Sequence, residues 1–149
     1  MTKPANEIVV TEIGSGFAQR IEAGGHVFSA DEPVSAGGTD AGPDPYALLL
    51  AALGACTSMT IRLYVSRKKW PLERVAVRLR HERVYAKDCE ECVENRDGHV
   101  ERITREIELF GTLTAEQKAR LVEIAERCPV HRTMAGPTKI VTRLKESAG

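Results

Sequence analysis

The chain has 149 residues, of which 42% are hydrophobic, enough for one domain with a substantial core but not for two large domains. Lysine plus arginine equals aspartate plus glutamate at 21 each, so no net charge draws the protein towards nucleic acid or anionic lipid. Aromatic residues make up only 5%, too few for the stacking surfaces that bind single-stranded nucleic acid.

The hydropathy pattern predicts a cytoplasmic protein with no membrane partner. No run approaches the roughly 18 consecutive apolar residues of a membrane helix, and residues 1–10 lack the apolar centre of a secretory signal. In the cytoplasm, cysteines are more often free, catalytic or metal-bound than joined in structural disulfides. The positions of the four cysteines therefore matter: Cys56, Cys89, Cys92 and Cys128.

The first third of the chain predicts short strands followed by one long helix. Apolar alternation and the glycine pairs at 24–25 and 37–38 are typical of antiparallel strands with tight turns. Asp44 followed by Pro45 predicts a helix start. From Tyr46 to about Lys69 the segment is apolar around its whole circumference, which predicts a helix buried on every side.

A helix buried on every side needs more cover than so short a chain supplies. If a sheet covers one face, a second copy of the chain can cover the other. The sequence therefore predicts a homodimer with this helix near its centre.

The second half of the chain predicts a hairpin, a helix and a last strand. Residues 73–85 and 99–111 alternate apolar and polar side chains, as two antiparallel strands would. Thr114 and Gln117 form a capping-box pattern before an amphipathic helix reaching Cys128. Residues 138–146 are expected to form a short strand. The order indicates an α+β fold in a single domain spanning residues 1–149.

Cys56 and Cys128 are either small core residues or reacting thiols. Free cysteine is often fully buried and packs as a small hydrophobe. Three local features favour reactivity: small residues beside Cys56, hydroxyls at Thr57 and Ser58, and the pair His131 and Arg132 within a turn of Cys128. Hydrogen-bond donors and cations stabilise a thiolate, which is the nucleophilic form. His131 is expected either to donate a proton or to cap a helix end.

Two segments carry a specific family resemblance. The stretches DPYALLLAALGACTSMTIRLY and AERCPVHRTM resemble the two cysteine motifs of the OsmC and Ohr family of thiol peroxidases. The stretches DEP, GGTDAGPDPYALLL and RKKWPL are similar to a less well characterised OsmC-like branch. The order of strands and helices fits the family along nearly the whole chain.

The resemblance implies a fold and a redox cycle. It implies an OsmC-like α+β fold with antiparallel sheets, assembled as an intertwined homodimer with active sites at the interface. Cys56 would be the peroxidatic thiol and Cys128 its resolving partner, acting on an organic hydroperoxide without a cofactor. An external dithiol, of lipoyl type or another small dithiol, would reopen the disulfide. Apolar walls at Leu49, Leu53 and Met59 would favour organic substrates.

The sequence departs from the family beside the helix start. Family peroxidases carry a glutamate after the helix-starting proline, where this chain has Tyr46. A phenol cannot form the same ion pair, although its hydroxyl can donate a hydrogen bond. Ten residues of straight helix separate Tyr46 from Cys56 by about 15 Å, so a kink near Gly54 or a second subunit is required. Arg20 is the nearest candidate for the activating arginine and is equally well explained as a solvated strand residue.

Two other functions remain open. The pair Cys89 and Cys92 suggests metal or redox use, but zinc usually takes four ligands and no second such pair is present. The surrounding acids would raise the pKa of both thiols, and a local disulfide is an alternative. The replacement of the family glutamate also leaves room for a non-enzymatic dimer that binds a small molecule or senses redox state.

Overall fold

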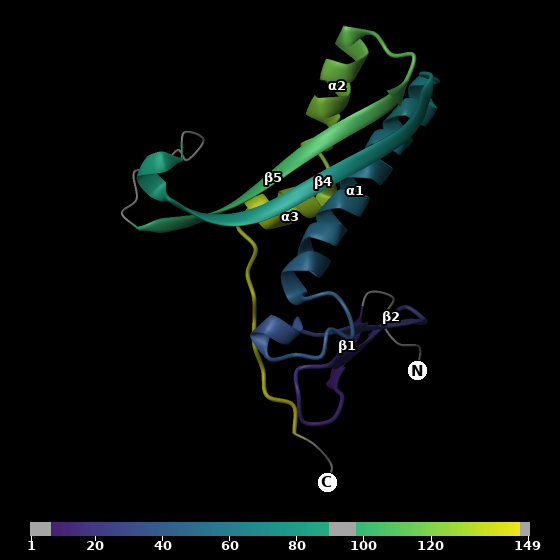
Figure 1. Cartoon of the computed structure of the whole chain (residues 1–149). Helices are drawn as coiled ribbons and strands as arrows, with labels where there is room; N and C mark the ends of the chain where they lie inside the picture. Colours follow the sequence, from purple (N-terminus) through teal and green to yellow (C-terminus); the bar gives the residue numbers. More distant parts are fainter. Residues whose placement is uncertain (1–6, 90–97, 147–149) are drawn as a thin grey trace. The chain divides into compact units, whose positions relative to one another are not determined.

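The computed structural model describes residues 7–89 and 98–146. As far as α2, its elements follow the predicted α+β order (Figure 1). They are β1 (Ile8–Glu12), β2 (Gln19–Ala23), β3 (His26–Ala30), η1 (Val34–Ala36), α1 (Pro45–Lys68), β4 (Leu72–Tyr85), η2 (Ala86–Asp88), β5 (His99–Gly111), α2 (Ala115–Ala125) and α3 (Pro129–Ala135). The chain divides into two compact units, one of Met1–Ala51 with Arg80–Thr104 and one of Ala52–Leu79 with Arg105–Gly149.

The first unit contains a three-stranded antiparallel sheet in the order β1-β2-β3. Val10 pairs with Ile21, and Ile21 with Phe28, so these apolar side chains share one face. Gly24 and Gly25 turn the chain between β2 and β3 with φ of +56° and +90°, a region that favours glycine. The predicted strands and glycine turn are confirmed.

A buried carboxylate organises the loop before α1. Asp31 accepts hydrogen bonds from the Thr39 hydroxyl at 2.6 Å and from the main-chain N–H groups of Glu32, Thr39 and Ala41 at 2.8, 3.1 and 3.2 Å. The Thr39 hydroxyl and these N–H groups lower the pKa of Asp31 to about 2, although burial opposes them. The loop then leads to Asp44, whose carboxylate caps α1 through the N–H of Ala47 at 2.8 Å.

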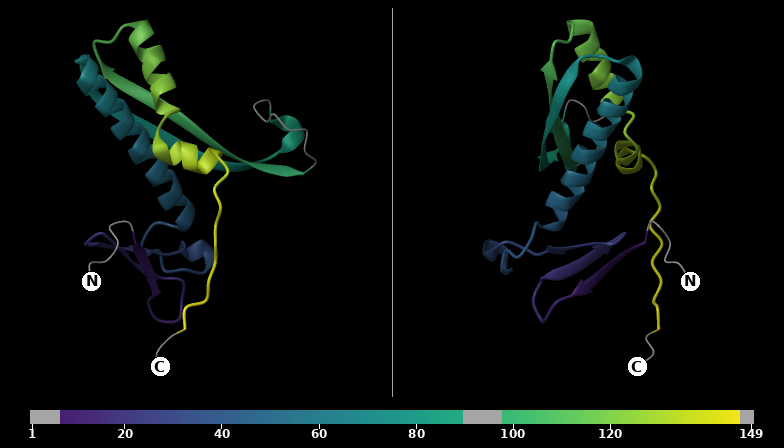
Figure 2. Two further views of the ribbon diagram at one scale, coloured as in Figure 1. Left: turned by 180° about the vertical axis from the view of Figure 1, so that it is seen from behind. Right: turned by 90° about the vertical axis from the view of Figure 1, so that its right-hand side faces the viewer.

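The strands β4 and β5 pair as a two-stranded sheet. Tyr85 contacts the ring of His99 towards one end of the pair. Arg74 stacks on Phe110 towards the other end, as antiparallel strands require. In the second unit, α1, α2 and α3 lie on the same face of this hairpin (Figures 1 and 2). The predicted hairpin and capped helix are confirmed, and Thr114 and Gln117 form the expected capping box.

The core of the second unit lies between α1, α2 and the hairpin. Its fully buried members are Ile61, Val65, Leu72, Leu121 and Ala125, with Val75, Ile107 and Leu109 packed against them. At Gly54 an added Cβ would lie 2.8 Å from Cδ1 of Leu79, so the missing side chain allows α1 to approach β4 closely. The packing of Gly54 against Leu79 therefore fixes how closely α1 lies to β4 beside Cys56.

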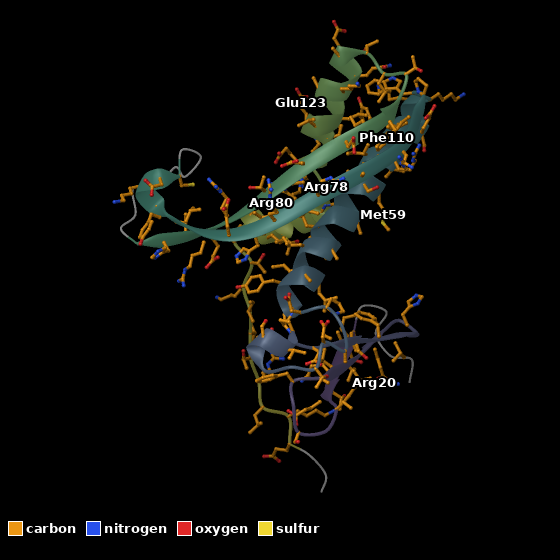
Figure 3. The ribbon with its side chains drawn as sticks, viewed as in Figure 1. Arg20, Met59, Arg78, Arg80, Phe110 and Glu123 are labelled. Atoms are coloured by element: carbon orange, nitrogen blue, oxygen red, sulfur yellow. The ribbon has the colours of Figure 1, made fainter. Side chains whose placement is uncertain are left out.

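The helix α1 is buried along one face and not on every side. Its buried residues are Leu53, Thr57, Ile61 and Val65, whereas Met59 is 70% exposed and projects from the helix (Figure 3). Within a single chain, β4, β5 and α2 cover only one side. Among the described residues α1 is also the one helix long and apolar enough to cross a membrane, as the core helix of a globular protein can be.

The structure differs from the expectation in the last part of the chain. A short helix, α3, follows α2 directly, and residues 138–146 are not a strand. The apolar side chains of this last segment are exposed, 87% at Ile140 and 93% at Leu144. A strand exists only when another strand pairs with it, and no paired strand in the described part of the chain includes this segment.

Candidate active site

Cys56 and Cys128 come from two elements of the second unit. Cys56 lies on α1 beside the stripe formed by Leu53, Thr57 and Ile61, and so at the edge of the buried face, where it is partly exposed. Cys128 is fully buried and occupies the N-cap of α3, with Pro129 as the first helical residue. α2 ends at Ala125, so Cys128 begins α3 and does not end the preceding helix as expected.

The two thiols are in contact. Both are free, and the side chain of Cys128 hydrogen-bonds to Cys56. The main-chain N–H of His131 donates to Sγ of Cys128 at 3.2 Å. The fold thus brings two cysteines that lie 72 positions apart in the sequence into one site.

The surroundings of Cys56 favour its ionised form. Partial burial raises the pKa of the Cys56 thiol, because burial penalises charge. Hydrogen bonds from the Val130 N–H, the Cys128 thiol and the Thr60 hydroxyl, together with the positive charge of Arg105, outweigh burial and hold the pKa below its ordinary value. A lowered pKa on a partly exposed thiol is the condition for nucleophilic reactivity.

Arg105 is the positively charged residue whose charge acts on Cys56, and no motif in the sequence pointed to its role. Its side chain is only 10% exposed. Nη1 donates to Oγ1 of Thr57 at 3.0 Å, Nη2 donates to Nδ1 of His131 at 3.0 Å, and Nη2 lies 3.5 Å from Oε1 of Glu126. One signal was available: Arg105 occupies the same strand phase as Ile103 and Ile107, where the alternation calls for an apolar residue.

The expected supporting and pocket residues are divided between the two units. In the second unit, His131 contacts Arg105 and Glu126, Leu53 is buried at 5% exposure, and Met59 faces outward. Thr57, which was expected to donate to a thiol, instead donates to the Leu53 carbonyl at 2.7 Å and accepts from Arg105.

Tyr46, Leu49 and Arg20 belong to the first unit. The Tyr46 ring stacks on His81 at a centroid distance of 4.4 Å and an interplanar angle of 10°. His81 is in turn bonded through Nε2 to Oε2 of Glu101 at 2.6 Å. Leu49 is 40% exposed, and Arg20 forms an ion pair with Glu22 on its own strand, β2. These contacts fit a structural role for Tyr46 and a solvated strand position for Arg20.

The second cysteine pair gives no support to a metal site. Cys89 is disulfide-bonded, and Cys92 lies outside the described residues. Within residues 7–89 and 98–146, no group of three or more His, Cys, Asp or Glu side chains could hold a metal ion. A cysteine held in a disulfide supplies no thiolate ligand.

The sequence also matches a family profile. The profile described as OsmC-like protein matches residues 38–143, well over half of the chain and including both site cysteines. The chain belongs to the OsmC-like protein family. A search of curated protein sequences gave no match.

Solved structures of OsmC-like proteins share the fold. An OsmC-like protein from Mycoplasma pneumoniae has a TM-score of 0.69 at 19% identity, over 91% of this chain and 90% of that chain. A putative osmotic stress induced and detoxification response protein from Psychrobacter arcticus has a TM-score of 0.69 at 15% identity, over 89% and 90%. The organic hydroperoxide resistance protein OsmC from Legionella pneumophila has a TM-score of 0.62 at 20% identity, over 90% and 93%.

Proposed function

We propose that this OsmC-like protein is a cytoplasmic, thiol-dependent peroxidase that reduces organic hydroperoxides. The observation that carries the proposal is the contact between a partly exposed Cys56 of lowered pKa and a fully buried Cys128. Simple packing of Cys56 as a small hydrophobe predicts a raised pKa. The lowered pKa therefore favours a reacting thiol over a cysteine that only packs in the core.

The first step consumes the peroxide. The Cys56 thiolate attacks the outer oxygen of ROOH, an S–O bond forms and the O–O bond breaks. The leaving alkoxide takes a proton to become the alcohol ROH, and Cys56 is left as a sulfenic acid. The sulfur is oxidised by two electrons and the peroxide is reduced by two.

The second step protects Cys56 from further oxidation. The Cys128 thiol condenses with the Cys56 sulfenic acid, which forms the disulfide and releases water. An external dithiol then exchanges with this disulfide and returns both thiols, while the dithiol itself becomes a disulfide. No metal or organic cofactor takes part in this cycle.

Arg105 takes the role that we first gave to Arg20. Its side chain is nearly buried and its positive charge lowers the pKa of Cys56. An arginine keeps its charge at all relevant pH values and so can stabilise the thiolate continuously. Stabilisation of the thiolate by Arg105 would let the site work without the family glutamate, whose position Tyr46 occupies.

We further propose a homodimer in which a second copy covers the outer side of α1. Met59 and Leu63 are 70% and 55% exposed in the single chain, and both lie on the same side of the helix as the partly exposed Cys56. A partner placed there would enclose the thiol between apolar walls and favour organic over hydrogen peroxide.

Two proteins of the same fold are named for hydroperoxide resistance. The Legionella pneumophila protein is an organic hydroperoxide resistance protein, as is one from Elizabethkingia anophelis, which shares the fold with a TM-score of 0.62 at 19% identity. At such identities the likeness establishes the fold, and the activity rests on the cysteine site.

The test is hydroperoxide turnover by the Cys56→Ser variant. Cumene hydroperoxide consumption with dihydrolipoamide as reductant is expected to fall to the uncatalysed rate, because a serine hydroxyl is not ionised at neutral pH. Ser66→Ala, an exposed change further along the same helix, serves as the matched control and should retain activity. Unchanged turnover in Cys56→Ser would end the assignment.

A further inference from the structure

Arg105 is held at three points, and one of them determines the protonation of a histidine. Its guanidinium bonds to Thr57, to Nδ1 of His131 and to Glu126. An arginine side chain carries donors and no acceptor. The 3.0 Å contact between Nη2 and Nδ1 is therefore a hydrogen bond only if Nδ1 has no proton.

The other ring nitrogen completes the assignment. Nε2 of His131 lies 3.2 Å from Oε2 of Glu126. A carboxylate is an acceptor, so Nε2 must carry the proton that Nδ1 lacks. The two contacts together select the neutral Nε2–H tautomer, with Glu126 at one edge of the ring and Arg105 at the other.

We propose that His131 is a positioning residue: its neutral Nε2–H form, fixed by Glu126, holds the Arg105 guanidinium where it stabilises the Cys56 thiolate. The inference rests on the proposed role of Cys56 as the reacting thiol. It replaces the expectation that His131 donates a proton, since both ring nitrogens are already occupied. The bond that His131 makes to Cys128 comes from its main chain and does not depend on the ring.

The geometry explains why a neutral acceptor is used at this point. The charged side chains that contact the ring are Arg105 at Nδ1 and Glu126 at Nε2. A second carboxylate in place of the imidazole would add to the ion pair that Arg105 already makes with Glu126 at 3.5 Å, and would further offset the charge that Cys56 needs. A neutral acceptor fixes the guanidinium and adds no negative charge beside it.

Alkylation of Cys56 by iodoacetamide, followed at the peptide level by mass spectrometry, tests the proposal without peroxide turnover. His131→Asn keeps an acceptor near the position of Nδ1, whereas His131→Gln places its amide near Nε2 and leaves Arg105 without that acceptor. We expect alkylation at neutral pH to slow about fivefold in His131→Gln and by less than about twofold in His131→Asn. Thr133→Ala, on the same helix but exposed, is the control. Equal rates in the Asn and Gln variants would overturn the proposal.

A double-mutant cycle separates an effect through Arg105 from a direct one. If His131 acts by holding Arg105, His131→Gln should slow alkylation in the native protein but not in Arg105→Met. A full additional loss in the Arg105→Met background would show a direct role and contradict the proposal. A loss of peroxide turnover without a change in the alkylation rates would leave this result standing, because the double-mutant cycle measures thiol ionisation.

Nitrogen-15 NMR of the histidine-labelled native protein provides a test that needs no variant. The spectrum should assign the proton of the neutral His131 ring to Nε2, with Nδ1 unprotonated, at neutral pH. Replacement by Glu126→Gln should weaken this preference. A proton on Nδ1 in the native protein would contradict the assignment even if every variant failed to fold.

Discussion

The main-chain N–H of His131 lies 3.2 Å from Sγ of Cys128 and donates a hydrogen bond to it. Cys128 is fully buried, whereas Cys56 is partly exposed. A reducing dithiol should therefore attack the sulfur of Cys56 in the disulfide and release Cys128 as a thiolate stabilised by that N–H. Because Cys56 is the more exposed of the two, its sulfur should react both with the peroxide and with the reducing dithiol, whereas Cys128 should act as the resolving and leaving thiol.

Replacement of Cys128 should leave the first step intact and remove the second. In Cys128→Ser, Cys56 should still reach the sulfenic acid with one equivalent of hydroperoxide but should not form a disulfide. Excess peroxide should then convert it irreversibly to the sulfinic acid, seen by mass spectrometry as a gain of two oxygen atoms on the peptide containing Cys56. A Cys128→Ser protein that cycles normally would exclude Cys128 as the resolving thiol.

Removal of the Arg105 charge should make Cys56 less acidic. Because Arg105 lowers the pKa of Cys56, the pH at which alkylation accelerates should move upwards in Arg105→Gln, and the rate at neutral pH should fall about tenfold. Arg105→Lys keeps the charge and should lose less. The pH profile of iodoacetamide alkylation measures this shift, with Lys118→Gln, which removes an exposed charge on α2, as the control. An unchanged profile in Arg105→Gln would show that Arg105 does not stabilise the thiolate.

Asp31 should make stability depend on acid pH. Its folded pKa is about 2 against an ordinary value of 3.8, so its hydrogen bonds to Thr39 and the loop stabilise the fold above pH 3.8. That contribution should be lost progressively as the pH falls from 3.8 towards 2. Thermal unfolding should show Asp31→Asn with a lower Tm than the native protein at neutral pH, and the difference should shrink in acid. A constant difference across this range would contradict the assignment.

A charged residue on the outer side of α1 should disrupt the proposed dimer. We expect the native protein to sediment as a dimer and Met59→Lys or Leu63→Arg to weaken association by about tenfold or more, because a desolvated charge is costly in an interface. Val122→Lys, at an exposed apolar position on α2, is the control. Sedimentation of the native protein as a monomer at micromolar concentration would remove the dimer from the account.

Local sequence signals identified most of the elements. Asp44 with Pro45 located the start of α1, and Thr114 with Gln117 located that of α2, because caps act through neighbouring residues. Residues 99–111 were identified as a strand by their alternation, and β5 has these bounds. Each of these signals depends on a few neighbouring residues, so it can be recognised in a single sequence.

Features that depend on distant partners were harder to predict. The last segment, 138–146, has a strand-like pattern but no strand partner among the described residues. α3 was missed because Pro129 suggested a helix end, whereas proline also suits the first helical position. Arg105 was overlooked because its value lies in contacts with α1 and α3 that its own strand does not reveal.

The central claim is that Cys56 and Cys128 form one redox pair. It is tested most directly by peptide mapping of the native protein after one equivalent of cumene hydroperoxide, with free thiols blocked beforehand in a matched sample. The account predicts a new disulfide that joins Cys56 to Cys128, with the corresponding alcohol released in equal amount. Recovery of both cysteines as free thiols, or of either one joined only to another partner, would contradict it.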